Sequence, residues 1–577
     1  MEPAERARAA LARGDLIAAY DLSTAALAAG EDEELRHLQI LALARMGDTE
    51  RAMELFKGHG LEASPDPHRR AAGARLLKDR ALKLGEGPER QAALADAHRA
   101  YRAIFEESGD AFPGINAATL ALLSGQEDEA RTLAEAALGS ATEADFYGAV
   151  TRAEALLVLG RTDEARDALG AAPVRESKDH GARSTARRQL RLVARHHGIG
   201  EDLLDALAPP AVAHFAGHMF TADPARETQL REEIDAALDT AGVGFGYGAL
   251  ACGADILFAE ALLARGAELH VVLPFADEDF LMQSVRPGGE AWEPRFEACL
   301  AAAASVTRAT SIPFFGDPAQ YGYGSRIAMG LARLRAEHLQ SDPIQIVVWD
   351  GVPATGPAGT GADVAVWSEA DGQTRIVAPG PVNRAHRRPP PRHESGHERV
   401  LAAVLFTDFV GFSKLPEAAL PAFWDGVMRT VAEVLDEHES EVSCRNSWGD
   451  ALYAVTHSAP GAAEIALELQ ARLARFDYST LGLDGGGGMR VGVHYGSAWK
   501  ATDRITGRTT FYGTEVSRAA RIEPVTPPGA VFVTEPLAAI LALEARERFS
   551  CHYVGRIGLA KHYGDYPMYR LARAGGG

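Results

Sequence analysis

The sequence has few cysteines and no long apolar run. Its four cysteines, Cys252, Cys299, Cys444 and Cys551, lie far apart in a chain of 577 residues. Without a CxxC pair they indicate neither a zinc site nor a disulfide framework, and they fit a reducing compartment. No apolar stretch approaches the roughly 18 residues that span a bilayer, and the charged start MEPAERARAALARG lacks the core of a signal peptide. These absences predict a soluble, cytoplasmic protein without a membrane partner.

Positive charge is also scarce, because 79 Asp and Glu residues outnumber 59 Lys and Arg residues and leave a net charge of −20. A phosphate backbone needs a positive surface, so this composition argues against a nucleic-acid partner. A local basic pocket for a triphosphate remains compatible with it. The hydrophobic fraction of 46% is ordinary for a globular protein, and the length predicts about three or four domains.

Residues 1–205 have the apolar spacing of helices and almost no strand pattern. Four times a glycine is followed five residues later by an alanine: Gly14 and Ala19, Gly47 and Ala52, Gly125 and Ala130, Gly160 and Ala165. Glycine turns the chain between paired helices, and alanine allows them to approach closely. The pattern resembles tetratricopeptide repeats, and residues 112–125 also resemble the TRAFs-binding region of signalling kinases. We expect all-α repeats that are either a scaffold or a binding surface for a protein partner.

Residues 211–380 alternate apolar strand segments with helical ones. The segments AVAHFAG, AELHVVLPF and PIQIVVWDG are typical of strands, and ETQLREEIDAALDTA is typical of a helix. Residues 242–266 are interpreted as a glycine-rich turn that leads into a helix. This alternation predicts an α/β domain with a doubly wound parallel sheet.

Ligands of such sheets lie beyond the carboxyl ends of the strands, at glycine-rich turns whose backbone NH groups suit a phosphate. The candidate ligand site comprises Gly217, His218, Gly248, Gly253 and Asp255. The stretch GYGALACGADILFAEALLARGAELHVVLPF resembles the SLOG superfamily of Rossmann-like domains, and the resemblance implies a sensor of a nucleotide-like ligand. A purely structural spacer is one alternative. Another is an enzyme that cleaves a nucleotide N-glycosidic bond, with Glu260 as its first candidate residue.

Residues 381–397 contain three consecutive prolines among arginines and histidines. Consecutive prolines stiffen the chain and exclude a helix, so the segment is predicted to be a linker. A further domain is then expected at residues 398–573.

Two aspartates mark the candidate chemistry of this last domain. The apolar strand Val400–Phe406 leads to Asp408 and a turn at Gly411, and EVSCRNSWGDALYAVT is typical of two strands joined at residues 447–450. Asp408 and Asp450 would then face each other across adjacent strands. Two carboxylates held in this way repel each other unless a cation lies between them, and Mg²⁺ bound by carboxylates and substrate phosphates meets that need. Paired metals stabilise both oxygens of a displacement at phosphorus.

Five motifs resemble those of class III adenylate and guanylate cyclases, in the same order: FTDFVGFS, NSWGDALYAV, MRVGVHYG, FYGTEVSRAARI and GLAKHYGDYPMYRL. The resemblance implies an α+β, ferredoxin-like catalytic domain. It also implies a lyase that converts a nucleoside triphosphate to a 3′,5′-cyclic nucleotide and pyrophosphate, with two Mg²⁺ or Mn²⁺ ions per site. Asp408 and Asp450 become the metal ligands, together with the carbonyl oxygen of Phe409, and the turn residues Gly411 and Phe412 contact the substrate.

The resemblance assigns the remaining catalytic roles to three residues. Arg521 becomes the cation that stabilises the transition state, and Lys561, in the closing-strand motif, binds the triphosphate. Ser517, four residues before Arg521 on the same helical face, replaces the asparagine that positions the ribose in the family. A serine hydroxyl still donates and accepts but is shorter, which predicts lower or altered activity.

The two base-selecting positions of the family correspond to Asn446 and Thr510. An amide pairs well with the edge of adenine, and no glutamate is present to read guanine, so ATP is favoured. Because an amide and a hydroxyl also suit a pyrimidine, UTP and CTP stay open, as in bacterial defence cyclases that resemble this family. GTP stays open as well.

The resemblance implies an active site shared between two catalytic domains, so one chain predicts a homodimer. The order of the segments predicts a cyclase regulated by its N-terminal sensor and interaction domains. The alternative is a signalling adaptor that binds nucleotide with little turnover, which Ser517 keeps open.

Overall fold

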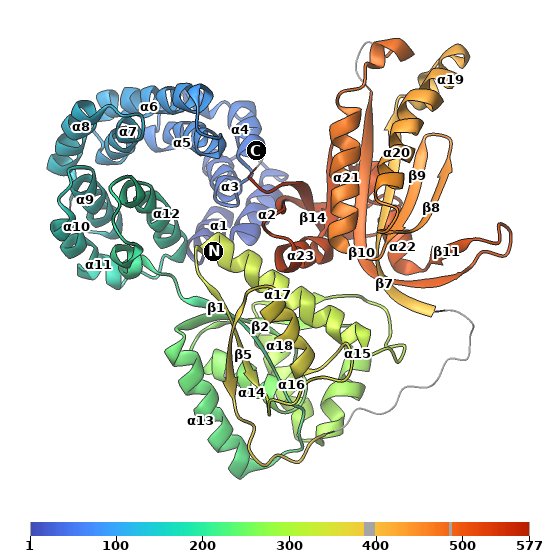
Figure 1. The fold of residues 1–577 in the computed structure, drawn as a ribbon. Helices are drawn as coiled ribbons and strands as arrows, with labels where there is room; N and C mark the ends of the chain where they lie inside the picture. Colours follow the sequence, from blue (N-terminus) through green and yellow to red (C-terminus); the bar gives the residue numbers. More distant parts are fainter. Residues whose placement is uncertain (1, 143, 386–397, 484–486, 576–577) are drawn as a thin grey trace. The chain divides into compact units, whose positions relative to one another are not determined.

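A computed structural model of the chain describes residues 2–142, 144–385, 398–483 and 487–575 (Figure 1). The chain divides into two compact units, the first consisting mainly of residues up to Pro209 and the second mainly of residues from Pro210 to Ala574. Most of the predicted linker, residues 386–397, lies outside the described residues. None of the described helices combines the length and the apolar character that crossing a bilayer requires.

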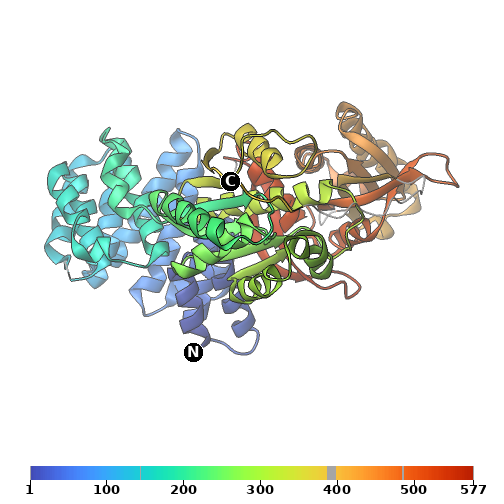
Figure 2. The ribbon, with the colours of Figure 1, turned by 90° about the horizontal axis from the view of Figure 1, so that it is seen from below.

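The first unit consists of helices, which Figures 1 and 2 show following one another along a curved path. Asp15, Asp32 and Asp48 begin three of them, because each aspartate accepts a hydrogen bond from the backbone NH three residues ahead. The helices are α1 (Pro3–Ala12), α2 (Leu16–Leu27), α3 (Glu33–Arg45), α4 (Thr49–Gly58), α5 (Pro67–Lys83), α6 (Pro88–Ser108), α7 (Ala111–Leu123), α8 (Glu127–Ser140), α9 (Phe146–Val158), α10 (Thr162–Leu169), α11 (Ala172–Arg175) and α12 (His180–His196).

The glycine–alanine repeat marks the turns between paired helices. The four glycines have φ values between 72° and 87°, a region that costs glycine least: Gly14, Gly47, Gly125 and Gly160. The alanines five residues later are at most 1% exposed, where a larger side chain would separate the helices: Ala19, Ala52, Ala130 and Ala165. The prediction of paired helices is confirmed.

The second unit contains a six-stranded sheet in the order β4-β3-β2-β1-β5-β6, with every pair parallel as predicted. The order runs outward from β1 in both directions, and the reversal between β1 and β5 opens a crevice at their carboxyl ends. The strands and main helices are β1 (Ala211–Gly217), α13 (Pro224–Thr240), β2 (Val243–Gly248), α14 (Ala254–Ala264), β3 (Glu268–Leu273), α16 (Trp292–Ala302), β4 (Ser305–Arg308), α17 (Ala319–Leu339), β5 (Pro343–Val348), α18 (Thr360–Glu369) and β6 (Gln373–Val377).

The glycine-rich segment 242–266 differs from its prediction. Its first part is not a turn but strand β2, paired with β1 and β3. The glycines admit bulky neighbours, since a Cβ on Gly246 would lie 2.2 Å from a methyl group of Leu262 and one on Gly248 would lie 2.6 Å from Phe215. Close approach of this kind explains why a central strand carries residues of low strand propensity.

The C-terminal part of the second unit contains a mixed sheet in the order β13-β14-β12-β10-β7-β9-β8, with β11 paired to β10. β10 and β12 are parallel, and the other pairs are antiparallel. The strands are β7 (Glu398–Val410), β8 (Val442–Trp448), β9 (Ala451–Thr456), β10 (Gly488–Thr502), β11 (Thr509–Tyr512), β12 (Val531–Thr534), β13 (Phe549–Gly558) and β14 (Asp565–Arg573), and the main helices are α20 (Arg429–Glu437), α21 (Ala459–Leu473), α22 (Thr514–Ala519) and α23 (Glu535–Glu544).

The strand expected at Val400–Phe406 is longer than predicted. β10 pairs with β7 from Glu398 to Val410, and these ladder hydrogen bonds extend the strand at both ends. Asp408 therefore lies inside β7 and not after it.

Candidate active site

Asp408 and Asp450 lie at neighbouring points of the mixed sheet. β7 pairs with β9, and a two-residue turn that includes Asp450 joins β9 to β8. The backbone NH of Phe409 donates a hydrogen bond to Asp450 Oδ2 at 3.3 Å. Burial raises the pKa of the Asp450 carboxyl, and the charge of Asp408 raises it further. The Asp408 carboxylate is thus close enough to oppose the ionisation of Asp450.

The surroundings of these aspartates have an excess of negative charge. Arg490 on β10 lies opposite Asp408 in the strand register and forms ion pairs with both Asp408 and Glu523. Burial raises the pKa of Glu523 to about 7, and the charges of Asp408 and Asp450 add to this effect against the opposing charge of Arg490. One guanidinium therefore faces three carboxylates, a balance that favours a further cation.

Side chains alone do not enclose a metal at this place. Among the described residues, no group of three or more His, Cys, Asp or Glu side chains is arranged to hold an ion. A cation at Asp408 and Asp450 would take its remaining ligands from backbone, water or substrate oxygens, as Mg²⁺ commonly does.

The turn after β7 brings the other residues of the first motif beside the aspartates. Phe409 is 1% exposed, and its ring lies 5.0 Å from that of Phe423. Gly411 has a φ of 99°, which favours glycine, and it begins the short helix that contains Phe412. The Phe412 ring lies 3.7 Å from where a Cβ on Gly449 would be, so it covers the turn that carries Asp450.

Ser517, Arg521 and Lys561 form a second group. Ser517 is exposed on α22, and the backbone NH of Ala560 donates to the carbonyl of Arg521 at 3.4 Å, which joins the loop of Lys561 to the end of α22. Within the described part of the chain, the side chains of Arg521 and Lys561 have no hydrogen bond or ion pair, and the buried Arg521 Nε lacks an acceptor. Two cations without counter-ions on adjacent loops suit a polyanionic ligand.

Two placements differ from their predictions. Arg521 lies beyond the helix that carries Ser517, because α22 ends at Ala519 and the NH of Arg521 bonds to the carbonyl of Arg518 in a tighter turn before Pro524. Lys561 does not lie in the closing strand. It has a φ of 62° in the turn before β14, which begins at Asp565.

A buried ionic network anchors α22 to the sheet. His494 on β10 lies 2.7 Å from Glu515, and Arg518 pairs with the same carboxylate. Burial opposes the ionisation of Glu515, but His494 and Arg518 outweigh it and lower the pKa to about 2. The motif MRVGVHYG, which places Arg490 and His494 on the same face of a strand, was the available signal, but only the packing of α22 against β10 reveals the partners of His494.

The two predicted base-selecting residues lie on neighbouring strands. Asn446 is exposed on β8, where its Oδ1 accepts a hydrogen bond from the NH of Ser447 at 3.0 Å. Thr510 lies on β11 next to Thr509, whose carbonyl accepts a hydrogen bond from Cys444 of β8 at 3.2 Å. The contact between Cys444 and Thr509 thus brings the strand segments that carry the two positions together.

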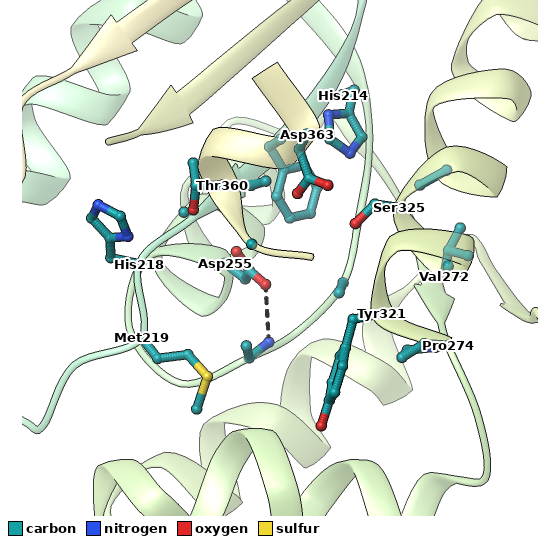
Figure 3. A pocket seen from close by; sticks show the side chains of 18 of the residues that line it. His214, His218, Met219, Asp255, Val272, Pro274, Tyr321, Ser325, Thr360 and Asp363 are labelled. Carbon is teal, nitrogen blue, oxygen red and sulfur yellow. Dashed lines mark hydrogen bonds between the residues drawn. The ribbon is translucent and has the colours of Figure 1, made fainter. Parts of the chain in front are cut away.

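A cavity of about 620 Å³ at the carboxyl end of β1 forms a second candidate site (Figure 3). Gly217, His218 and Asp255 line it. His218 lies 3.1 Å from Asp350, and Arg384 contacts both. Figure 3 shows Asp255 bonded to a backbone NH, with Thr360, Asp363, Ser325 and Tyr321 around the same space.

Gly248 and Gly253 do not line this cavity. A Cβ on Gly253, at a φ of 95°, would lie 2.7 Å from the carbonyl of His218, so this glycine allows two loops to meet. Arg384, from the predicted linker, lines the cavity although no sequence pattern indicates it. Glu260 lies outside the cavity in ion pairs with Arg231 and Arg295, and the glycosidic-cleavage hypothesis finds no support there.

Two family models match the chain. Residues 395–572 match the adenylate and guanylate cyclase catalytic domain, and residues 15–121 match the Tetratricopeptide Repeats-Sensor family, called TPR-S. Neither match reaches the central parallel sheet. Among curated proteins, none matches the chain.

Solved cyclase structures are similar to part of the chain. The adenylyl cyclase CyaB from P. aeruginosa is 16% identical over 31% of this chain and 96% of its own, with a TM-score of 0.27. The guanylate cyclase domain of RhGC from Catenaria anguillulae, solved with GTP, is 17% identical over 30% of this chain and 98% of its own, with a TM-score of 0.27. An adenylate cyclase from Trypanosoma brucei is 22% identical over 30% of this chain and 87% of its own, with a TM-score of 0.25.

The family matches agree with the helical hairpins of the first unit and with the mixed sheet of the second. Class III cyclase domains use divalent metal ions, nucleotide substrates and dimeric assembly. The chain therefore carries TPR-S repeats at residues 15–121 and the catalytic domain of a class III adenylate/guanylate cyclase at residues 395–572.

Proposed function

We propose that the protein converts ATP to 3′,5′-cyclic AMP and pyrophosphate. The observation that carries the proposal is the pair Asp408 and Asp450, held side by side in an electronegative part of a class III catalytic domain. Two carboxylates held this close repel each other unless a cation binds between them, and this arrangement indicates a cation-dependent reaction.

The residues present fit Mg²⁺ or Mn²⁺. Asp408, Asp450 and the Phe409 carbonyl offer oxygen ligands, and a cation would offset the repulsion that raises the pKa of Asp450. Two such ions per site would supply positive charge to the triphosphate and to the reacting oxygens. Arg490 would retain Glu523 as its counter-ion, at 2.8 Å.

The second group of residues supplies fixed positive charge and orientation. Arg521 stabilises the charge that develops on the oxygens around phosphorus, and Lys561 offers a compact ammonium to the leaving pyrophosphate. Ser517 orients the ribose through its hydroxyl, while Gly411 and Phe412 shape the turn against which the triphosphate lies.

Each active site is shared between two copies of the chain in this proposal. No described hydrogen bond or ion pair joins Asp408 or Asp450 to Ser517, Arg521 or Lys561. A two-fold dimer would bring the aspartates of one copy to the cations of the other and create two equivalent sites. The monomer would then be inactive.

Asn446 and Thr510 decide the base. An amide donates to N1 and accepts from the N6 amine of adenine, so ATP is the first choice, with UTP, CTP and GTP as the alternatives. We expect purified protein with Mn²⁺ to form cyclic AMP from ATP at least about tenfold faster than a cyclic product from the other three. Mass spectrometry of four separate reactions measures this.

Each outcome of that assay has a clear meaning. A cyclic pyrimidine or guanine nucleotide as the main product would contradict the assignment of ATP as substrate but would still support cyclase activity. No product from any substrate, with a dimer confirmed by light scattering, would favour the adaptor that binds nucleotide without turnover.

The proposed organisation has four parts: repeats at 1–205, a SLOG-like sensor at 211–380, a linker at 381–397 and the cyclase at 398–573. The cavity at His218 and Asp255 would bind a nucleotide-like regulator, because it lies where parallel sheets hold such ligands. The repeats would bind a protein partner or serve as a scaffold. Binding of the regulator would change how two cyclase domains meet.

Filling the central cavity tests the regulatory part. Ser325→Trp places a large side chain in the cavity, so we expect it to remove any several-fold change in cyclase rate caused by added nucleoside mono- or diphosphates, with the basal rate unchanged. Ser368→Trp, on the exposed side of α18, is the matched control. A nucleotide response that survives Ser325→Trp would place the regulator elsewhere.

A further inference from the structure

A second large cavity lies inside the helical unit, far from any proposed catalytic residue in the sequence. Its volume is about 670 Å³, within the range of small-molecule sites, and α3, α5, α7, α9 and α12 contribute most of its lining. Four cationic side chains line it: Arg45, Arg75, Lys78 and Arg188.

Lys78 is buried and has no counter-ion among the described side chains. It is 7% exposed, and its ammonium donates to Asn116 Oδ1 at 2.7 Å and to Gln189 Oε1 at 2.8 Å, both neutral acceptors. It forms no ion pair with any described carboxylate. Burial lowers its pKa to about 8. A buried ammonium that lacks an anion is costly, so its presence calls for negative charge from outside the chain.

The guanidinium groups around Lys78 are also poorly paired. In the described part of the chain, Arg45 and Arg188 have no hydrogen bond or ion pair, and the buried Arg45 Nε lacks an acceptor. Among the residues that the structure describes, Arg75 pairs with Asp79 alone, at 3.4 Å. Burial lowers the pKa of both Arg45 and Arg188, and the nearby charge of Arg75 lowers each further. These cations therefore repel one another across the cavity.

Of the acidic side chains that line the cavity, Asp79 pairs with Arg75, and the others are engaged elsewhere. Glu154 is 3% exposed and accepts hydrogen bonds from Thr119 and Gln189, and burial raises its pKa. Asp110 and Asp145 accept backbone NH groups at the starts of α7 and α9. The unpaired positive charge remains for a ligand.

Two aromatic side chains line the same cavity and are unusually exposed. Phe112 is 41% exposed and Tyr147 is 60% exposed, although both are large and mainly apolar. Such rings are suited to stack on a flat ring of a ligand. The cavity thus combines guanidinium groups with exposed aromatic rings.

We propose that this cavity binds a small molecule that carries a phosphate group and a planar ring. A guanidinium group can donate two parallel hydrogen bonds to phosphate oxygens, and the buried ammonium of Lys78 adds a compact positive charge. An acidic peptide would also meet the cations, but Lys78 lies at a depth that suits a small phosphorylated group better. The site adds an input for the protein beyond the proposed cyclase and the central cavity.

Calorimetry on the full chain tests the proposal. The Asp450→Asn background without divalent metal suppresses binding at the cyclase site, and the probes are AMP, GMP, UMP, inorganic phosphate, adenosine and a Glu-rich peptide. We expect at least one nucleoside monophosphate to bind about tenfold tighter than phosphate and adenosine not to bind. Arg188→Met should weaken that binding at least about tenfold, and the control Arg166→Met, which removes a surface pair with Asp202, should not.

A second measurement separates binding from a structural role. Removal of an unpaired, partly buried charge should raise the thermal midpoint of the ligand-free protein, so Arg188→Met should melt above the starting protein. A midpoint lowered by more than in Arg166→Met would make Arg188 structural and overturn the proposal. The proposal also fails if no monophosphate binds at about 5 mM, if only the peptide binds, or if Arg188→Met leaves the affinity unchanged.

Discussion

The Asp450→Asn variant is expected to lose cyclic nucleotide formation while it stays folded. In the proposed mechanism the carboxylate would hold a metal that supplies positive charge to the triphosphate, and loss of about 3 kcal/mol or more of transition-state stabilisation would lower the rate at least about 100-fold. The amide keeps the size of the side chain and the turn between β8 and β9. The measurement is the initial rate with Mn²⁺ and the preferred triphosphate.

The same variant should not be less stable than the parent at neutral pH. Burial and Asp408 raise the pKa of Asp450, so the folded state holds its proton more tightly than the unfolded state. The cost of ionising Asp450 is absent below the unfolded pKa and fully present above the raised folded pKa. Urea denaturation from about pH 4, close to the ordinary pKa of an aspartate, up to pH 8 should therefore show the free energy of unfolding of the variant rising relative to that of the parent.

An exposed aspartate provides the matched control. Asp425 pairs with Arg429 at 3.3 Å on the protein surface, and Asp425→Asn should change neither rate nor stability appreciably. A variant Asp450→Asn that retains activity within about threefold of the parent would remove Asp450 from the metal site and with it the main support for the proposed reaction.

Mixing two inactive variants is expected to restore activity. Arg521→Ala and Asp450→Asn damage opposite halves of each shared site, so a mixed dimer contains one site with both defects and one intact site. If chains exchange freely, half of the dimers are mixed, and the mixture should recover about a quarter of the parent rate. Arg521→Ala alone should lose activity mainly through kcat, because the cation acts on charge that develops in the transition state.

The exchange must be followed independently of activity. Native mass spectrometry with one isotopically labelled variant shows whether mixed dimers form. Arg556→Ala, at an exposed residue of β13 whose guanidinium contacts the Asp565 carbonyl at 3.1 Å, should behave as the parent and serves as control. An inactive mixture in which mixed dimers are abundant would contradict the shared site.

The local patterns of the sequence determined much of this protein. Glycine followed five residues later by alanine predicts a helix hairpin, because turn geometry and close helix contact are satisfied within one repeat. The same holds for the hairpin around Asp450, which the strand–turn–strand pattern predicts and the structure contains. Strands that alternate with helices likewise predict the parallel sheet.

Other features depend on contacts between distant segments. Strand β2 was predicted as a turn, since its glycines oppose strand propensity until Leu262 and Phe215 fill the space beside them. The register between β7 and β10 places Arg490 opposite Asp408. Helix α22 ends at Ala519, so Arg521 lies outside it.

The cavity of the repeats depends most on tertiary structure. Arg45, Lys78 and Arg188 come from three separate helices, and nothing in the local sequence of any of them distinguishes a surface cation from a buried one. Helix periodicity determines which face of each helix turns inward, but burial and the lack of counter-ions arise only when the helices close around a common space. The sequence determines which side chains carry a charge, whereas the neighbours of each charge in the folded protein determine its free energy.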